Sequence, residues 1–195
     1  MASPVAADLP QEIVVVSGLP RSGTSMMMQM LAAAGMPVAT DDERPPDPSN
    51  PFGYFEYAPV RRIVRDASWM EALTGQAVKV VAPLVRHLPA QHRYRVIFML
   101  RDLEAVLLSQ QRMLERLGTE ASPAPGLGEG LFAAQQASLR HCETMPQASL
   151  LRIHYEETVA KPLRAARRIA AFLAPWALDP APMAGAVRPP PRAPA

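Results

Sequence analysis

The residues with the most evident chemical use form one short segment, Gly18-Leu19-Pro20-Arg21-Ser22-Gly23-Thr24-Ser25. Its glycines have the spacing of a P-loop, G-x-x-x-x-G-K-[ST], with Thr24 in the place of the lysine. Glycines let the backbone wrap around an anion, and the free N–H groups at the start of the following helix point toward it. Arg21 adds a cation inside the loop itself. The segment therefore predicts a phosphate-binding loop, with an ordinary strand-to-helix turn as the alternative.

A second cation, Arg101, directly follows the apolar run of residues 94–100. An enzyme that uses Mg-ATP needs the P-loop lysine and an acidic residue at the end of a neighbouring strand, which holds the metal. Here Thr24 replaces the lysine, and Arg101 stands ahead of Asp102 at the end of the run. We therefore expect a second phosphate, rather than a metal ion, as the partner of Arg101. A P-loop small-molecule kinase stays as an alternative.

The elements that must position these residues alternate between strands and helices. Short β-branched runs predict strands, and longer segments with helical periodicity predict helices. The predicted strands are residues 12–17, 77–82, 94–100 and 149–155, and the predicted helices are residues 24–34, 58–72, 102–117, 129–143 and 161–173. This alternation favours an α/β domain with a mostly parallel central sheet flanked by helices. The Pro-rich loop at 40–53 is long for a compact domain, which marks it as a functional candidate.

Length and composition fit one globular domain, because the chain has 195 residues, of which 49% are hydrophobic and 19% charged. The formal net charge of +2 gives no broad surface for a polyanion, so we expect no nucleic-acid partner. We divide the chain into a flexible N-terminus (1–11), a P-loop domain (12–174) and a Pro/Arg-rich tail (175–195). The composition of the tail predicts an extended or disordered segment.

Cellular context is read from cysteine content and from apolar segments. Cys142 is the only cysteine, which excludes a disulfide within the chain. Residues 1–11 lack the basic region and apolar run of a signal peptide. No apolar stretch approaches the roughly 20 residues that span a bilayer. We therefore expect a cytoplasmic protein without a membrane partner, and we leave a homodimer open.

Three separated segments, in the same order along the chain, resemble the motifs of the PAPS-dependent sulfotransferases (PAPS is 3′-phosphoadenosine-5′-phosphosulfate). Residues 16–25 resemble the 5′-phosphosulfate loop of that family in its Pro-Arg-Ser-Gly-Thr form. Residues 96–102, with Ser109 eight residues after Arg101, resemble its 3′-phosphate motif. Residues 153–157 resemble the strand end that brings a tyrosine, here Tyr155, near the adenine.

The resemblance covers roughly residues 12–174 and is greatest to short bacterial members that continue through residues 50–56, Asn-Pro-Phe-Gly-Tyr-Phe-Glu. It implies a three-layer P-loop NTPase-like fold and a transferase that moves a sulfuryl group from PAPS to a hydroxyl or amine acceptor. The acceptor would be a small molecule or a peptide, the product PAP (3′-phosphoadenosine-5′-phosphate), and no metal would take part. A non-catalytic PAP-binding protein with the same fold is the first alternative. The donor site implied by the resemblance comprises Pro20, Arg21, Ser22, Gly23, Thr24, Ser25, Arg101, Ser109 and Tyr155.

The catalytic cations expected for this reaction are Arg21 and Lys79, because negative charge develops on the leaving phosphate. Lys79 lies among valines in a predicted strand, and an edge-strand lysine is its structural alternative. Larger cytosolic members of the family carry a histidine base two residues after the lysine that Lys79 matches. Val81 stands there in this chain, so the base must lie elsewhere.

Acidic residues of the long loop and its end are the candidate bases. In protein-tyrosine sulfotransferases, a glutamate and an arginine follow the loop arginine by about 21 and 23 residues, and Asp42 and Arg44 stand at those separations from Arg21. We therefore prefer Asp42 and the adjacent Glu43 to Glu56 as the catalytic base. A solvated acidic turn is the structural alternative for the pair.

Overall fold

A single parallel sheet forms the centre of the molecule. The computed structural model describes residues 10–41, 45–47, 50, 52–116, 118 and 126–188. The four strands lie in the order β2-β1-β3-β4, and every neighbouring pair is parallel. They are β1 (Glu12–Gly18), β2 (Ala77–Lys79), β3 (Arg93–Leu100) and β4 (Ala148–His154). The predicted α/β fold with a parallel central sheet is thus confirmed.

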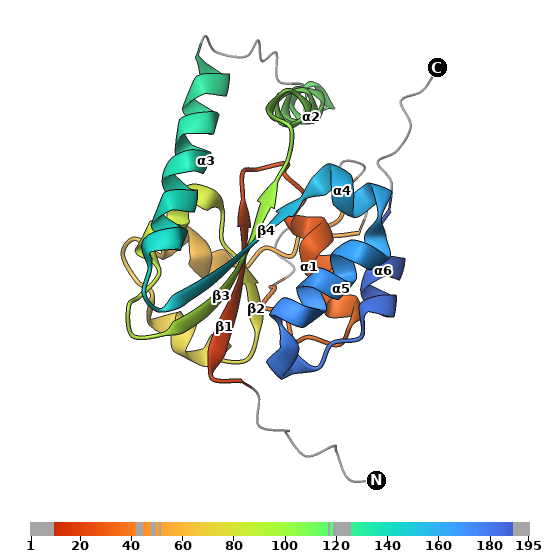
Figure 1. Ribbon diagram of the computed structural model, residues 1–195. Helices are drawn as coiled ribbons and strands as arrows, with labels where there is room; N and C mark the ends of the chain where they lie inside the picture. The colour runs from red at the N-terminus through yellow and green to blue at the C-terminus, as the bar shows by residue number, and fades with distance from the viewer. Residues whose placement is uncertain are drawn as a thin grey trace.

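Helices cover both faces of the sheet, which gives three layers (Figure 1). The α-helices are α1 (Thr24–Ala33), α2 (Leu103–Arg116), α3 (Leu127–Thr144), α4 (Tyr155–Ala160), α5 (Pro162–Phe172) and α6 (Pro180–Ala186). The 3-10 helices are η1 (Ala58–Arg62), η2 (Ser68–Leu73), η3 (Ala82–His87) and η4 (Ala174–Trp176). Figure 1 shows α1, α5 and α6 on one side of the sheet and α3 on the other. None of the described helices combines the length and apolar character that crossing a membrane requires.

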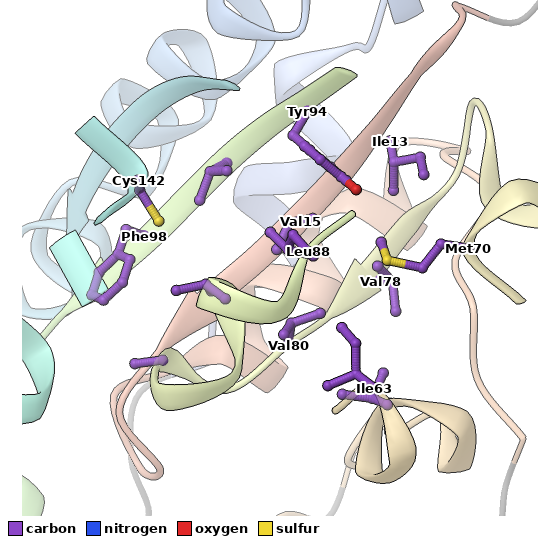
Figure 2. Close-up of a cluster of buried hydrophobic side chains, with 14 of the residues drawn as sticks. Ile13, Val15, Ile63, Met70, Val78, Val80, Leu88, Tyr94, Phe98 and Cys142 are labelled. Carbon is purple, nitrogen blue, oxygen red and sulfur yellow. The ribbon is translucent and has the colours of Figure 1, made fainter. Parts of the chain in front are cut away.

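The two apolar cores follow from alternation along β1. Ile13 and Val15 point to one face and Val14 and Val16 to the other, and all four side chains are buried. The first face packs in a cluster with Val78, Val80, Tyr94, Phe98 and Cys142 (Figure 2). The second face packs against α1, α5 and α6. Burial on both faces explains why the sequence of this strand is a continuous apolar run.

Cys142 belongs to the first of these cores and is buried. Burial raises the pKa of its thiol to about 11, because the charged thiolate would lose its hydration. The thiol therefore stays protonated near neutral pH, as expected of a structural cysteine.

The prediction of a single helix over residues 58–72 is wrong. The segment forms η1 and η2 instead, with a break at Asp66. The carboxylate of Asp66 accepts hydrogen bonds from the backbone N–H of Ser68 at 3.0 Å and from its hydroxyl at 2.7 Å. This side-chain contact competes with continuous helical hydrogen bonding, which the apolar periodicity of the segment could not reveal.

The prediction of an extended tail over residues 175–195 is wrong for residues 175–188. Pro180 begins α6, where its missing N–H has no helical partner to lose. Met183 of α6 is fully buried, and the indole N–H of Trp176 donates to the carbonyl of Gly75 at 2.8 Å. Proline therefore starts a packed helix here. Residues 189–195 lie outside the described part of the chain, as do residues 1–9 of the predicted flexible N-terminus.

Candidate active site at the carboxyl edge of the sheet

The predicted phosphate-binding loop joins β1 to α1 and depends on two glycines. Gly18 has φ 147° and Gly23 has φ 98°, values that L side chains rarely adopt. A Cβ at Gly18 would lie 2.7 Å from the carbonyl oxygen of Met99, and one at Gly23 would lie 2.6 Å from Cδ2 of Tyr155. The two glycines therefore let Met99 and Tyr155 approach the loop closely.

Arg21 occupies the centre of the loop in a strained conformation. Its φ of 69° is left-handed, which costs a non-glycine residue roughly 1–2 kcal/mol. Its Nε donates to the hydroxyl of Ser109 at 3.0 Å, and its Nη1 lies 3.9 Å from the sulfur of Met113. Both partners belong to α2, so this helix contacts the loop through the Arg21 side chain.

Arg101 approaches the same loop from the end of β3. Its Nη1 donates to the backbone carbonyl of Arg21 at 2.8 Å. Its guanidinium carbon lies 4.2 Å from the ring centroid of Tyr155, a cation–π distance. The structure thus brings Arg21, Arg101, Ser109 and Tyr155 together, as the sequence predicted they would be. The first two are joined through a backbone carbonyl, a contact that sequence patterns do not reveal.

Three buried polar atoms of this region have no hydrogen-bond partner within the described structure: Nε of Arg101 and the Oγ atoms of Ser17 and Ser22. A buried donor without a partner costs about 1–3 kcal/mol, and more when it is charged. An anion that accepts hydrogen bonds would suit the guanidinium of Arg101. The cations and the free loop N–H groups therefore fit a phosphate-bearing ligand.

Lys79 lies on the opposite side of the loop, at the end of β2, and is 8% exposed. Its Nζ donates to the carbonyl of Tyr54 and lies 3.9 Å from Oε1 of Glu56. The hydroxyl of Ser25 donates to the same carbonyl at 3.2 Å. β2 is an edge strand, as the structural alternative had it, but the Lys79 ammonium is buried and compensated rather than directed to solvent.

The backbone around Tyr54 explains this arrangement. Phe55 has a left-handed φ of 50°, a second strained residue near the loop. The carbonyl of Tyr54, which precedes Phe55, and the carboxylate of Glu56, which follows it, both contact Lys79. Oε2 of Glu56 also lies 3.4 Å from Nη2 of Arg61. The turn thus holds a carboxylate between two cations.

Most of these residues line one pocket of about 370 Å³, within the size range of small-molecule sites; Ser22 and Ser109 of the predicted donor site are not among its lining residues. Its described lining is Pro20, Arg21, Gly23, Thr24, Ser25, Met26, Asn50, Tyr54, Glu56, Tyr57, Val60, Arg61, Lys79, Val81, Leu84, Arg101, Met113 and Tyr155. The sheet order puts β2 and β3 on opposite sides of β1. We therefore distinguish a β3 side of the pocket, with Arg101 and Tyr155, from a β2 side, with Lys79 and Val81.

The predicted catalytic residues have different outcomes. Arg21, Lys79 and Glu56 line the pocket. Asp42 and Glu43, which the sequence favoured over Glu56, lie outside the described residues and stay predictions. Within the described chain, no group of three or more His, Cys, Asp or Glu side chains is placed to hold a metal ion. Sequence reasoning missed the Tyr54 carbonyl, because a backbone atom has no sequence signature.

Solved structures with a similar fold include two sulfotransferase domains. The sulfotransferase domain of the olefin synthase from Synechococcus PCC 7002 is 16% identical, with a TM-score of 0.50 over 87% of this chain and 75% of that chain. The sulfotransferase domain from the curacin biosynthetic pathway is 18% identical, with a TM-score of 0.49 over 86% and 75%. An unliganded sugar kinase from Janibacter sp. HTCC2649 is 16% identical, with a TM-score of 0.49 over 86% and 97%. Likeness at these identities concerns the fold alone.

The sequence comparison is more specific. No curated protein matches the chain. The profile described as "Sulfotransferase family" matches residues 81–177, about half of the chain, a range that contains Arg101, Ser109 and Tyr155. The predicted phosphate-binding loop, residues 18–25, lies before this range. The chain is therefore a member of the sulfotransferase family.

Proposed function

We propose that the chain is a PAPS-dependent sulfotransferase that acts without a metal ion on a hydroxyl or amine acceptor and releases PAP. The observation that carries the proposal is Arg101, whose buried Nε has no partner in the described structure. It stands at a strand end beside the phosphate-binding loop, where Mg-ATP chemistry needs an acid. A second phosphate of the ligand satisfies this cation.

The donor would be held on the β3 side of the pocket. The free N–H groups at the start of α1 and the side chain of Arg21 suit the 5′-phosphosulfate. Arg101 and the hydroxyl of Ser109 suit the 3′-phosphate, since both already contact Arg21. Tyr155, against which Arg101 stacks, offers its ring near the adenine.

PAPS, when bound, supplies the sulfuryl group, whose bond to the phosphate oxygen is exchanged for a bond to the acceptor. Arg21 and Lys79 can neutralise charge on the leaving phosphate. Lys79 is suited to this, because its contacts with Tyr54 and Glu56 fix its position in advance. Glu56, whose carboxylate lines the pocket, is the base that we propose, with Asp42 and Glu43 as the remaining candidates.

Binding calorimetry with PAP, AMP and ATP tests the proposal. PAP should bind at least about thirtyfold more tightly than AMP, because breaking a buried charge-assisted contact typically costs about 2–5 kcal/mol. A chelator should change neither affinity. Equal affinity for PAP and AMP would remove the 3′-phosphate assignment, and a preference for Mg-ATP would favour the kinase. PAP binding without transfer to any acceptor would identify a non-catalytic nucleotide-binding protein.

A further inference from the structure

The backbone carbonyl of Tyr54 is shared by two polar groups of the pocket. Nζ of Lys79, at the end of β2, and the hydroxyl of Ser25, in the first turn of α1, both donate to this oxygen. Tyr54 is 5% exposed and Lys79 is 8% exposed, so water has little access to replace these hydrogen bonds. The orientation of this carbonyl therefore strongly influences where the ammonium of Lys79 is held.

A backbone carbonyl is oriented by the dihedral angles on either side of it, here ψ of Tyr54 and φ of Phe55. Phe55 has a φ of 50°, a left-handed value that is strained for a bulky side chain. Such a conformation persists only where the surrounding structure holds it. The contacts that hold this turn therefore also fix the carbonyl to which Lys79 donates.

Asp47 provides contacts of this kind through both of its carboxylate oxygens. Its Oδ2 accepts a hydrogen bond from the hydroxyl of Tyr54 at 2.6 Å, and its Oδ1 accepts one from the backbone N–H of Asn50 at 3.0 Å. The side-chain amide of Asn50 in turn donates to the carbonyl of Gly53 at 2.7 Å. A short hydrogen bond from a hydroxyl to a carboxylate is among the strong ones. One carboxylate thus holds the ring end of Tyr54 and the chain that leads to it.

We propose that Asp47 and Tyr54 are positioning residues for Lys79. The inference rests on the proposed function, in which Lys79 neutralises charge on the leaving phosphate. Asp47 acts through Tyr54, because its carboxylate fixes the tyrosine hydroxyl and the tyrosine carbonyl fixes the ammonium. A cation held in place before the reaction needs no rearrangement when negative charge develops.

The composition of the chain permits a direct test, because Lys79 and Lys161 are its only lysines. Protein isotopically labelled at the lysine Nζ nitrogen has one ammonium group of each kind for nuclear magnetic resonance. Lys161 is exposed, so it provides the reference for an ammonium in contact with water. The rate at which the ammonium protons of Lys79 exchange with water, measured without a ligand, reports how firmly this side chain is held.

Tyr54→Phe removes the hydroxyl that donates to Asp47 and keeps the backbone carbonyl. It should speed proton exchange at Lys79 about three- to tenfold and leave Lys161 unchanged, because the loss of one hydrogen bond changes an equilibrium by about that factor. Asp47→Ala should have at least the same effect, and Asp47→Asn, which keeps an acceptor oxygen, a smaller one. The double variant Asp47→Ala/Tyr54→Phe should exchange no faster than Asp47→Ala alone, because both substitutions break the same hydrogen bond.

Tyr94→Phe is the matched control. It also removes a tyrosine hydroxyl from a buried residue, but that hydroxyl donates to the carbonyl of Pro89 at 2.7 Å, near the start of β3. The start of β3 lies at the opposite edge of the parallel sheet from Lys79, which ends β2. Tyr94→Phe should therefore leave proton exchange at Lys79 unchanged, even if it lowers the stability of the fold.

The reaction itself gives a second measure. Single-turnover transfer from radiolabelled PAPS should slow about three- to tenfold in Tyr54→Phe, whereas PAP affinity should change less than about twofold, because a pre-positioned charge acts mainly in the transition state. Tyr94→Phe should leave both quantities unchanged. A loss of PAP affinity as large as the loss of transfer rate would contradict a positioning role.

The outcomes separate this inference from the proposed function. Unchanged proton exchange at Lys79 in both Tyr54→Phe and Asp47→Ala would overturn the positioning role, even if the chain binds PAP. Equal acceleration in Tyr94→Phe would also overturn it, because general loosening of the fold would then be the cause. Absence of PAP binding by the wild-type chain would overturn the proposed function and the catalytic purpose of Lys79 with it, and the exchange rates, which need no ligand, distinguish that failure from the first two.

Discussion

The two sides of the pocket are built differently. On the β3 side, Arg101 and Tyr155 directly follow strands, and Ser109 lies on the long helix α2. On the β2 side, Val60 and Leu84 lie in the short 3-10 helices η1 and η3. The β3 side presents Arg101 and the ring of Tyr155, whereas the β2 side presents Lys79 and Glu56 beside the apolar Val81 and Leu84. A donor that is the same in every turnover suits the regular side, and an acceptor that differs between enzymes suits the irregular one.

Sheet register explains why the β3 side is well ordered. Leu100 pairs with His154 across β3 and β4, so the next residues, Arg101 and Tyr155, emerge side by side. Their stacking at 4.2 Å follows from this register. On the β2 side, the pairing of β1 with β2 ends at Lys79, the last residue of β2. Its geometry depends on side-chain contacts such as that between Lys79 and the Tyr54 carbonyl.

The largest expected effect tests the chemistry of the β2 side. Glu56→Gln should lower turnover by roughly 10²–10⁴-fold, because the amide cannot accept the acceptor's proton. PAP affinity should change little, since Glu56 lies away from the β3 side. Single-turnover transfer from PAPS and calorimetry with PAP measure the two quantities separately.

Asp42→Asn and Glu43→Gln are the matched substitutions for this prediction. If Glu56→Gln keeps full turnover and one of these variants loses it, the base belongs to residues 42–43. If all three variants stay active, the acceptor needs no protein base. An amine acceptor would behave in this way, because its nitrogen can attack without first losing a proton.

Arg101→Gln tests the β3 side. It should lower PAP affinity at least about thirtyfold, because a buried charge-assisted contact is lost. AMP, which lacks the 3′-phosphate, should lose much less affinity, so the ratio of the two affinities is the informative quantity. Arg112→Gln removes an exposed arginine of α2 and serves as the control for net charge. An equal loss for PAP and AMP would indicate that Arg101 acts only by holding the Arg21 carbonyl.

Much of the β3 side could be predicted from the sequence. Arg101 follows the apolar run of residues 94–100, and Ser109 lies eight residues later, two turns along a helix with strong periodicity. Strand ends and long helices are local features, so spacing alone brings these residues together. The contact through the backbone of Arg21 could not be predicted, because it depends on the left-handed φ at that residue.

A glycine pair tests how closely the loop is packed. Gly23→Ala should destabilise the fold by roughly 2 kcal/mol or more, because it adds left-handed strain and a contact of 2.6 Å with the Tyr155 ring. It should also weaken PAP binding, because the loop N–H groups move. Gly130→Ala in α3 meets nothing within 4 Å and should be neutral or stabilising. Urea unfolding measures both, and equal effects would show that the loop tolerates a side chain.

The β2 side and the chain's end were less predictable. Val60 and Ile63 have helical spacing, which predicted one helix, but the side chain of Asp66 interrupts it. The proline content after residue 175 predicted an extended tail, but Pro180 occupies a helix start and Met183 fills the core beside α1 and α5. In both places, tertiary or side-chain contacts override local composition.

The smallest expected effect concerns Asp66, which separates η1 from η2. Hydrogen bonds from the hydroxyl and backbone N–H of Ser68 hold the pKa of Asp66 below its ordinary value of 3.8. Its contribution to stability is therefore complete above that value and is lost as the pH falls through the lowered pKa. Asp66→Ala should slightly lower the melting temperature near neutral pH and should leave PAP affinity unchanged. Asp66→Asn keeps an acceptor oxygen and should have a smaller effect, and Ser68→Ala, which removes one of the two hydrogen bonds, should fall between them. If Asp66→Ala weakened PAP binding, the two sides of the pocket would be one coupled unit and the contrast between them would fail.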